Sequence, residues 1–293
     1  MKMGKSRSNV LFLKSLEKRL ARRHVPQALA EAEGLLVHFG DVDRLSFFTG
    51  DRALTKRARK KVEGALRARS KGVPFAHLLG ETEFYGRHFQ VTKDVLIPRP
   101  ETELLVEEAL KVLESVASPK VLDVGTGSGC IAVSLAMERP DCKVTALDSS
   151  AKALRATRHN IRSYHLGRRI RLLKSDLFGR LSGKERHFWD VIVSNPPYVP
   201  AEDFPTLSKE VLSEPRLALD GGPKGLSVIR RILSEAPLFL KPGGWLLMEI
   251  GKGQSNVLRE EIEEREVFLG VRFVKDYAGI ERVLAVRRQE KSL

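Results

Sequence analysis

The sequence has only two cysteines among its 293 residues, Cys130 and Cys142, and their spacing fits neither a metal site nor a redox pair. This usage favours a reducing compartment. No apolar run approaches the roughly 20 residues needed to cross a bilayer. The basic start holds an apolar piece of only residues 10–13, too short for a secretory signal. We therefore expect a cytoplasmic protein with no membrane partner and no metal.

Acidic residues are scarce in the first quarter of the chain. Residues 1–75 contain 18 Lys and Arg but only 7 Asp and Glu, so +11 of the formal net charge of +14 lies there. Such asymmetry indicates an acidic protein surface or a nucleic acid as partner of this part. The alternative is that the charges only keep helix faces solvated. The overall composition, 42% hydrophobic and 30% charged, is typical of a folded globular protein.

The length allows two domains, and the pattern of apolar residues divides the chain. Apolar residues recur at helical spacing in residues 9–24, 27–39 and 55–69, with Asn9 placed as an N-cap, which predicts a small helical domain over residues 1–74. In residues 75–100, the stretches EFYGRHFQV and VLIPRP are rich in β formers and predict a β-hairpin connector. The remainder, residues 101–293, forms the last predicted domain.

Short apolar runs alternate with helix-length segments after residue 101. The runs are VLDVG, KVTALD, IRLLKSD, DVIVSN and WLLMEI. This alternation predicts an α/β fold, a Rossmann-like and mostly parallel sheet covered by helices on both faces. The last two runs, VRFVKD and RVLAVR, are too close together for a helical crossover, so we expect an antiparallel C-terminal strand.

A glycine-rich loop joins a predicted strand to a predicted helix in VLDVGTGSGCIAVSLA, residues 121–136. Gly125, Gly127 and Gly129 let the chain turn tightly and let a ligand approach the helix N-terminus, although close packing of strand on helix would need glycines too. Asp148 follows at the tip of the next strand, where a carboxylate can accept hydrogen bonds from two ribose hydroxyls. Together these features favour a nucleoside-binding site over close packing alone.

The loop has the spacing G-x-G-x-G, which differs from the G-x-G-x-x-G that seats a pyrophosphate. Asp123 would also repel a pyrophosphate, whereas it suits a cationic ligand such as S-adenosylmethionine. After a third strand, Asp176 and Leu177 reach the same edge and could hold an adenine, or could form an ordinary turn.

The stretch VSNPPYVP, residues 193–200, ends a predicted core strand with an amide and two prolines. Asn-Pro is a common turn starter, so the motif alone could be punctuation. At the carboxyl edge of the sheet, however, the Asn195 side-chain oxygen and the Pro196 carbonyl could accept the two N–H groups of an amide or a base. The prolines would stiffen the loop, and the Tyr198 ring could pack on the planar acceptor. This arrangement predicts N-methyl transfer.

The chain resembles the protein-(glutamine-N5) methyltransferases that modify release factors, the HemK/PrmC family. The matching stretches are FAHLLGETEFYGRHFQV, VLIPRPETELLVE, VLDVGTGSGCIAVSLA, VSNPPYVP, EPRLALDGGPKGL, LKPGGWLLMEIG and KDYAGIERVL. They cover most of the chain from about residue 74 onward, whereas the N-terminal helices match only in length and helical character. NPPY alone does not separate this family from enzymes that methylate amino groups of adenine or guanine. The IPRPETE stretch and its hairpin are more specific and favour this family over the related ribosomal-protein glutamine methyltransferases.

The resemblance implies a class I S-adenosylmethionine-dependent methyltransferase fold and transfer of a methyl group to the glutamine of the Gly-Gly-Gln loop in class 1 release factors, with S-adenosylhomocysteine as product. It implies a cofactor site made of Gly125, Thr126, Gly127, Ser128, Gly129, Asp148, Asp176, Leu177 and Asn195. It also implies catalysis by Asn195, Pro196 and Tyr198 and a substrate site of Asn195, Pro196, Pro197 and Tyr198, with Arg99 and Glu101 bracing its rim. Position 177 is often aromatic in this family, so Leu177 is a departure from its pattern.

The basic N-terminal domain would dock an acidic release-factor surface. We expect a monomer that does not bind nucleic acid. Three other functions fit part of the pattern: methyl transfer to amino groups of DNA or RNA bases, nicotinamide-dependent oxidoreduction on a similar sheet, and non-catalytic RNA binding through charge alone. The oxidoreductase lacks its expected glycine motif, and RNA binding leaves NPPY unexplained.

Overall fold

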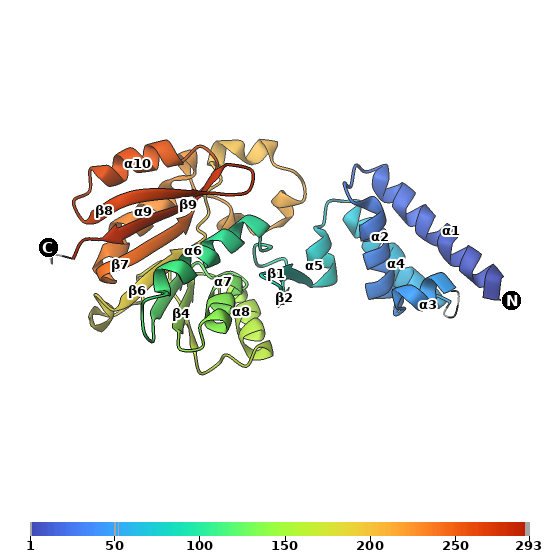
Figure 1. Cartoon of the computed structure of the whole chain (residues 1–293). Coiled ribbons are helices and arrows are strands. Elements are labelled where there is room, and N and C mark those ends of the chain that lie inside the picture. Colours follow the sequence, from blue (N-terminus) through green and yellow to red (C-terminus); the bar gives the residue numbers. More distant parts are fainter. Residues whose placement is uncertain (1, 50, 52, 291–293) are drawn as a thin grey trace. The chain divides into compact units, whose positions relative to one another are not determined.

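The structure is a computed structural model that describes residues 2–49, 51 and 53–290 (Figure 1). Met1 and residues 291–293, the outer ends of the first and last predicted domains, lie outside the described residues. The chain divides into two compact units. One contains Met1–Gly80 together with Ser208–Ser213, and the other contains Glu81–Leu207 together with Glu214–Leu293. No helix within the described residues has the length and apolar character to span a bilayer.

The first unit is helical. Its helices are α1 (Lys2–Ala21), α2 (Ala28–Gly40), α3 (Arg44–Thr49), α4 (Lys56–Arg69) and α5 (Phe75–Leu79). Leu16, Leu35 and Leu66, from three of these helices, are fully buried in one apolar cluster. The expectation that Asn9 caps a helix is wrong. Asn9 lies within α1, and its buried amide donates a 2.9 Å hydrogen bond to the Phe47 carbonyl.

A segment from late in the chain completes this unit. Arg69 is 3% exposed, and its guanidinium donates a 2.9 Å hydrogen bond to Glu31 and pairs with Glu210 at 2.7 Å. The Ser213 hydroxyl donates to the Gly72 carbonyl at 3.2 Å. Arg69 is a buried charge, and pairing with two carboxylates offsets the cost of removing it from water.

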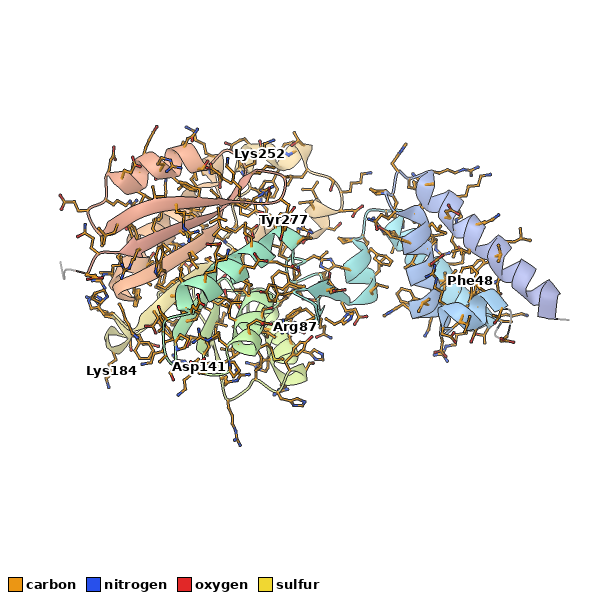
Figure 2. The ribbon with its side chains drawn as sticks, viewed as in Figure 1. Phe48, Arg87, Asp141, Lys184, Lys252 and Tyr277 are labelled. Atoms are coloured by element: carbon orange, nitrogen blue, oxygen red, sulfur yellow. The ribbon has the colours of Figure 1, made fainter. Side chains whose placement is uncertain are left out.

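The β-hairpin differs from the one expected in the connector. Strand β1 (Glu81–Phe84) pairs antiparallel with β2 (Arg87–Gln90) around Tyr85-Gly86, and VLIPRP forms no strand. Both turn residues have positive φ, 52° and 67°, which is the geometry of a two-residue type I′ turn. Arg87, labelled in Figure 2, pairs with Glu138 at 2.6 Å and so ties the hairpin to the rest of the second unit.

The second unit is built on a sheet of seven strands among the described residues, in the order β5-β4-β3-β6-β7-β9-β8. The strands are β3 (Lys120–Val124), β4 (Lys143–Asp148), β5 (Ile170–Lys174), β6 (Trp189–Ser194), β7 (Leu240–Glu249), β8 (Phe268–Lys275) and β9 (Glu281–Arg288). Strands β3 to β7 pair in parallel, whereas β9 is antiparallel to β7 and β8. The predicted mostly parallel sheet with an antiparallel C-terminal strand is confirmed.

Helices cover both faces of this sheet (Figure 1). They are α6 (Glu103–Leu113), α7 (Cys130–Glu138), α8 (Ala151–Ser163), α9 (Ser227–Glu235) and α10 (Ser255–Glu263). Successive strand residues point to opposite faces, so Val121 packs in a cluster with α6, α7 and α8 while Leu122 packs in another with α9 and α10. Both residues are fully buried.

Short 3₁₀ helices occupy several connections. They are η1 (Pro100–Thr102), η2 (Gly183–Glu185), η3 (Ala201–Thr206), η4 (Val211–Ser213), η5 (Arg216–Ala218), η6 (Pro223–Gly225) and η7 (Ala236–Leu238). The strand order reverses at β3, which lies between β4 and β6. In open α/β sheets the ligand crevice lies at the carboxyl ends of the strands at this switch point. The glycine loop after β3, Asp148 at the end of β4 and the Asn-Pro-Pro-Tyr loop after β6 meet at this edge.

Candidate active site

The glycine loop turns the chain from β3 into α7 through backbone conformations that favour glycine. Gly125, Gly127 and Gly129 have φ of 78°, 59° and 85°. A Cβ on Gly129 would lie 2.6 Å from a methyl carbon of Thr157. Gly129 thus allows close packing of the loop on α8 and is not among the pocket-lining residues, whereas Gly125 and Gly127 line the pocket.

Asp148 lies at the end of β4, and backbone groups orient its carboxylate. Its two oxygens accept hydrogen bonds from Gly127 N–H at 2.9 Å and Ser150 N–H at 2.8 Å. Burial raises the pKa of Asp148, while these two hydrogen bonds favour the ionised form. An ionised carboxylate offers about four acceptor positions. Two therefore remain for a ligand in the adjoining pocket.

Asp123 is a fully buried acid two residues before Gly125. Its Oδ2 accepts a 2.6 Å hydrogen bond from the hydroxyl of Thr126, a pocket-lining residue. Its Oδ1 accepts no hydrogen bond of good geometry within the described part of the chain, and the nearby backbone N–H of Ala132 also favours the ionised form. Burial raises the pKa of Asp123 to about 7, and the charge of Asp148 adds to the shift. A buried acid with an unpaired oxygen next to a pocket fits a cationic ligand.

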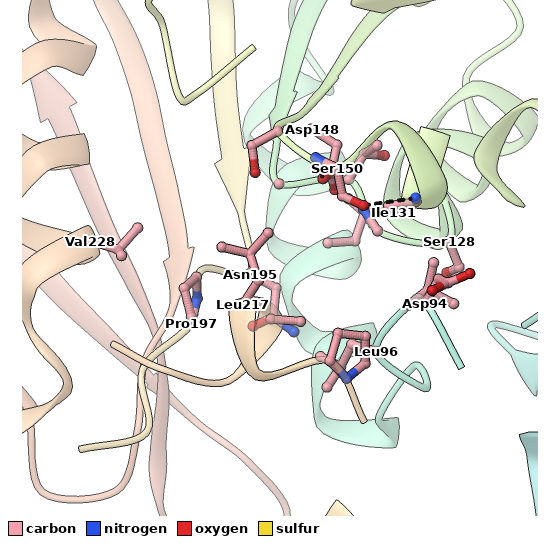
Figure 3. A pocket seen from close by; sticks show the side chains of 18 of the residues that line it. Asp94, Leu96, Ser128, Ile131, Asp148, Ser150, Asn195, Pro197, Leu217 and Val228 are labelled. Atoms are coloured by element: carbon pink, nitrogen blue, oxygen red, sulfur yellow. Dashed lines mark hydrogen bonds between the residues drawn. The ribbon is translucent and has the colours of Figure 1, made fainter. Parts of the chain in front are cut away.

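One pocket of about 240 Å³ lies along the carboxyl edge of the sheet (Figure 3). Predicted site residues that line it are Gly125, Thr126, Gly127, Ser128, Asp148, Asp176, Leu177, Asn195 and Pro197. Apolar side chains from other segments, among them Leu96, Ile131, Leu217 and Val228, complete the wall. Gly129, Pro196, Tyr198, Arg99 and Glu101 are not among the lining residues.

Asp176 and Leu177 both line the pocket. Leu177 has a φ of 43°, and its carbonyl accepts a 2.7 Å hydrogen bond from the Ser175 hydroxyl. Exposed Asp176 pairs with Arg231 of α9 at 3.1 Å. Both residues of this ion pair and Leu177 line the pocket, so a ligand there would meet a carboxylate paired with a guanidinium and, beside them, an apolar side chain.

Asn195 stands at the end of β6 in the pocket wall (Figure 3). The preceding Ser194 donates a 2.7 Å hydrogen bond to the Val124 carbonyl, which joins the loop to β3. The half-buried Asn195 amide donates from Nδ2 to Thr102 Oγ1 at 3.1 Å. Pro196 is buried, whereas Pro197 faces the pocket.

Tyr198 points its hydroxyl into the core. The hydroxyl donates a 3.0 Å hydrogen bond to the buried carboxylate of Glu249, and the ring packs against the α9 and α10 side of the sheet. The Tyr198 carbonyl accepts a 3.0 Å hydrogen bond from Gln254. Burial and the charge of Glu249 raise the pKa of Tyr198. These contacts hold Tyr198 in place from both its backbone and its side chain.

Arg99 and Glu101 follow the connector. Arg99 pairs with Glu214, whose side chain is 2% exposed and also accepts a 2.8 Å hydrogen bond from Ile97 N–H. This pair fixes the segment that presents Leu96 and Pro98 to the pocket. Glu101 is exposed in η1, next to Thr102.

Sequence reasoning assigned no role to Thr102, Glu214 or Glu249. Each lies inside a stretch on which the family resemblance rests, IPRPETE, EPRLALDGG or LLMEIG. The sequence contains one signal for such residues, an acid within an apolar run, as in LLMEI. An acid there is expected to be buried, and a buried carboxylate needs hydrogen-bond donors. The identity of those donors depends on tertiary contacts.

Family models and relatives match most of this chain in sequence. The model "Methyltransferase small domain" matches residues 100–222, and "PrmC N-terminal domain" matches residues 12–80. The chain is 40% identical over 270 residues to the release factor glutamine methyltransferase of Geobacter sulfurreducens, covering 92% of each chain. It is 42% identical over 265 residues to that of Burkholderia pseudomallei, covering 89% of this chain and 92% of the relative.

Two solved structures are similar to this chain, one in fold and one in sequence. The hMettl16 catalytic domain in complex with MAT2A 3'UTR hairpin 6 matches with a TM-score of 0.58 at 16% identity, over 78% of this chain and 82% of that chain, which confirms the methyltransferase fold. A release factor-specific protein-(glutamine-N5) methyltransferase from Alicyclobacillus acidocaldarius is 36% identical, with a TM-score of 0.41, over 69% of this chain and 99% of that chain. With 40% identity over nearly its whole length, the chain belongs to the release factor glutamine methyltransferase family.

Proposed function

We propose that the protein transfers a methyl group from S-adenosylmethionine to the side-chain amide nitrogen of the glutamine in the Gly-Gly-Gln loop of class 1 release factors. The names of its relatives supply the substrate class. The observation that carries the proposal is the Asn195 amide, which lines the pocket while Thr102 accepts its N–H. Its oxygen therefore remains for a donor on the substrate. We place this activity in the cytoplasm, where release factors act, and propose a monomer.

The acceptor nitrogen of glutamine is a weak nucleophile because its lone pair is delocalised into the carbonyl. Fully breaking this conjugation would cost about 18–20 kcal/mol, judged from the barrier to amide rotation. In our proposal, the Asn195 side-chain oxygen and the Pro196 carbonyl each accept one N–H of the substrate. They orient the nitrogen and stabilise the positive charge that develops there. The methylated nitrogen then releases a proton, so no titratable base is needed.

The fixed geometry of the loop matters as much as its chemistry. Pro196 and Pro197 restrict the backbone, and Tyr198 is held through Glu249 and Gln254. Dipoles that are already aligned need no reorganisation in the transition state. Precise placement of the nucleophile could contribute about 7–11 kcal/mol. We retain Tyr198 as a residue that borders the glutamine, although its hydroxyl is used in the core.

S-adenosylmethionine, when bound, supplies an electrophilic methyl group on a positively charged sulfur and leaves as S-adenosylhomocysteine. We propose that Asp148 accepts hydrogen bonds from the ribose hydroxyls and that Asp176 and Leu177 border the adenine. Thr126 and Ser128, with Gly125, Gly127 and Gly129, form the loop against which the cofactor lies. Asp123, with its unpaired oxygen, favours the cationic part of the ligand.

The rim and the helical unit would receive the rest of the substrate. We propose that Arg99, through its pair with Glu214, and Glu101 brace the entrance for the glutamine loop. The basic helical unit, residues 1–74 in the predicted division, would dock an acidic release-factor surface. Exposed Lys56, Lys60 and Lys61 on α4 are charges available for that contact.

Incubation with labelled S-adenosylmethionine tests the proposal. Purified release factor, the same factor with the Gly-Gly-Gln glutamine replaced by alanine, and DNA or RNA are offered in parallel. We expect label in the unaltered release factor alone, and tandem mass spectrometry should place it on the glutamine side chain. Label in nucleic acid alone, or on another residue of the release factor, would overturn the proposal.

A further inference from the structure

A chain of hydrogen bonds runs from Asn195 into the core of the second unit. Asn195 Nδ2 donates to Thr102 Oγ1 at 3.1 Å, and the Thr102 hydroxyl donates to Glu249 Oε2 at 2.6 Å. The other oxygen of Glu249, Oε1, accepts from the Tyr198 hydroxyl at 3.0 Å. Four side chains from η1, β7 and the loop after β6 are thus linked, and two of them, Thr102 and Tyr198, donate directly to the Glu249 carboxylate.

The inner members of this chain are shielded from water. Thr102 and Glu249 are each 1% exposed. Burial raises the pKa of Glu249, while hydrogen bonds from Thr102 and Tyr198 and the charge of Arg282 favour its ionised form and the charge of Glu101 opposes it. Burying a carboxylate without hydrogen-bond donors costs free energy. The hydroxyl groups next to Glu249 are therefore expected to donate their hydrogen bonds to it.

When Glu249 is ionised, this constraint fixes the direction of every hydrogen bond in the chain. An ionised carboxylate can only accept, and a threonine hydroxyl has one proton to donate. Because Thr102 gives that proton to Glu249, its oxygen must accept from the group on its other side. Asn195 must therefore turn its NH₂ toward Thr102. Its Oδ1 then lies on the opposite branch of the planar amide and forms no hydrogen bond within the described part of the chain.

We propose that Thr102 and Glu249 are positioning residues that hold the Asn195 amide with its oxygen presented to the acceptor, so that the site selects a glutamine amide over a carboxylate. An amide with the opposite orientation would present N–H groups, which would repel the substrate NH₂ and attract a glutamate. The selectivity of the site thus originates in a buried carboxylate that does not touch the substrate. This inference rests on the proposed glutamine substrate.

Thr102→Val tests the chain because valine keeps the shape of threonine and removes its hydroxyl. We expect turnover to fall about 10- to 100-fold. This range is taken by analogy from metal sites, where removing a residue that orients a ligand side chain has an effect of that size. S-adenosylhomocysteine affinity, measured by calorimetry, should not change. Thr102→Ser should restore most of the turnover. Thr145→Val is the matched control, because it also removes a buried threonine hydroxyl, but from β4 and outside the hydrogen-bond chain. It should leave turnover unchanged.

Two further readouts separate positioning from a general structural role. Thr102→Val should cause no further loss in an Asn195→Ala background, because the hydroxyl acts through Asn195. A release factor with glutamate at the acceptor position should inhibit the Thr102→Val enzyme more strongly, relative to the glutamine form, than it inhibits the original enzyme. The second readout measures orientation directly.

The inference would be overturned if the losses of turnover from Thr102→Val and Asn195→Ala multiplied in the double variant. It would also be overturned if Thr102→Val discriminated against the glutamate form of the release factor as well as the original enzyme does. Full turnover by Thr102→Val would overturn it too. If Thr102→Val does not fold, Thr102→Ser and Thr102→Ala are compared, and equal turnover by these two variants would contradict the chain. Failure of the unaltered enzyme to methylate any release factor would instead refute the proposed function.

Discussion

In the proposed function the pocket has a cofactor half and a substrate half, and the two are held in place by different kinds of interaction. In the cofactor half, Asp148 is oriented by backbone N–H groups of Gly127 and Ser150, 21 and 2 residues away in the sequence. In the substrate half, Asn195 is oriented by Thr102, 93 residues away, which in turn is oriented by Glu249, 147 residues from it. Local backbone geometry therefore organises one half, and tertiary contacts between side chains organise the other.

This difference matches the tasks of the two halves. A cofactor shared by many enzymes can be held by a loop whose geometry depends on few residues. The acceptor group instead needs donors and acceptors in one defined orientation, and buried side chains that fix each other provide that orientation. Substitutions in the substrate half should thus change turnover, and substitutions in the cofactor half should change the affinity for the cofactor.

The largest effect is expected for Asn195→Ala. It removes the acceptor of the proposed transition state, and the loss of one such group costs about 100-fold or more in turnover. Initial rates with labelled S-adenosylmethionine measure this loss, and calorimetry should find nearly unchanged S-adenosylhomocysteine affinity. Retained turnover would remove Asn195 from the mechanism.

Asp148→Ala should instead weaken binding of the cofactor. Hydrogen bonds to a charged group contribute about 1.5–3 kcal/mol, so affinity for S-adenosylhomocysteine should fall roughly 10- to 100-fold. Turnover at saturating cofactor should fall much less than for Asn195→Ala. Unchanged affinity in a calorimetric titration would contradict the ribose contact.

The pH dependence of cofactor affinity should follow Asp123. Because burial raises the pKa of Asp123 to about 7, this carboxyl group changes from mostly neutral to mostly ionised as the pH rises through that value. Affinity for S-adenosylmethionine should therefore fall as the pH is lowered through about 7, by at most about tenfold per unit. Asp123→Asn should flatten this dependence near pH 7. A steep dependence that persists in Asp123→Asn would assign it to another group, of which Asp148 is the nearest candidate.

The smallest effect is expected outside the pocket. Lys60→Glu with Lys61→Glu reverses two exposed charges on α4 and should raise the KM for intact release factor about threefold to fivefold, with weaker salt dependence. A short Gly-Gly-Gln peptide should show no change. Lys184→Glu with Lys252→Glu, in exposed parts of the second unit labelled in Figure 2, is the matched control. Equal effects of both pairs would reject docking by the helical unit.

Sequence reasoning predicted residues of the glycine loop and the next strand that line the pocket, because the signals for them are local. A strand, a glycine loop, a helix and an acid at the tip of the next strand are all readable from residues 121–148, and the structure brings them to one edge. The same reasoning found Asn195 but not the residues that orient it. Thr102 and Glu249 look like ordinary helix-start and strand residues until the fold brings them together.

The errors also have physical causes. The hairpin was predicted at the wrong place because its turn is Tyr85-Gly86. Tyrosine is a weaker signal than asparagine or aspartate for a turn position with positive φ. Asn9 fits a helix cap by residue type, but a buried asparagine can equally donate to a distant carbonyl, here that of Phe47. In both cases the local propensity favoured one structure and a tertiary contact or an uncommon turn residue determined another.

A crystal structure of the protein with S-adenosylhomocysteine and a glutamine-containing release-factor fragment, at about 1.2 Å or better so that amide oxygen and nitrogen can be told apart, tests the account most directly. We expect the Asn195 oxygen to accept an N–H of the glutamine while its nitrogen still donates to Thr102. A glutamine bound away from Asn195, or met by the Asn195 nitrogen, would contradict the account.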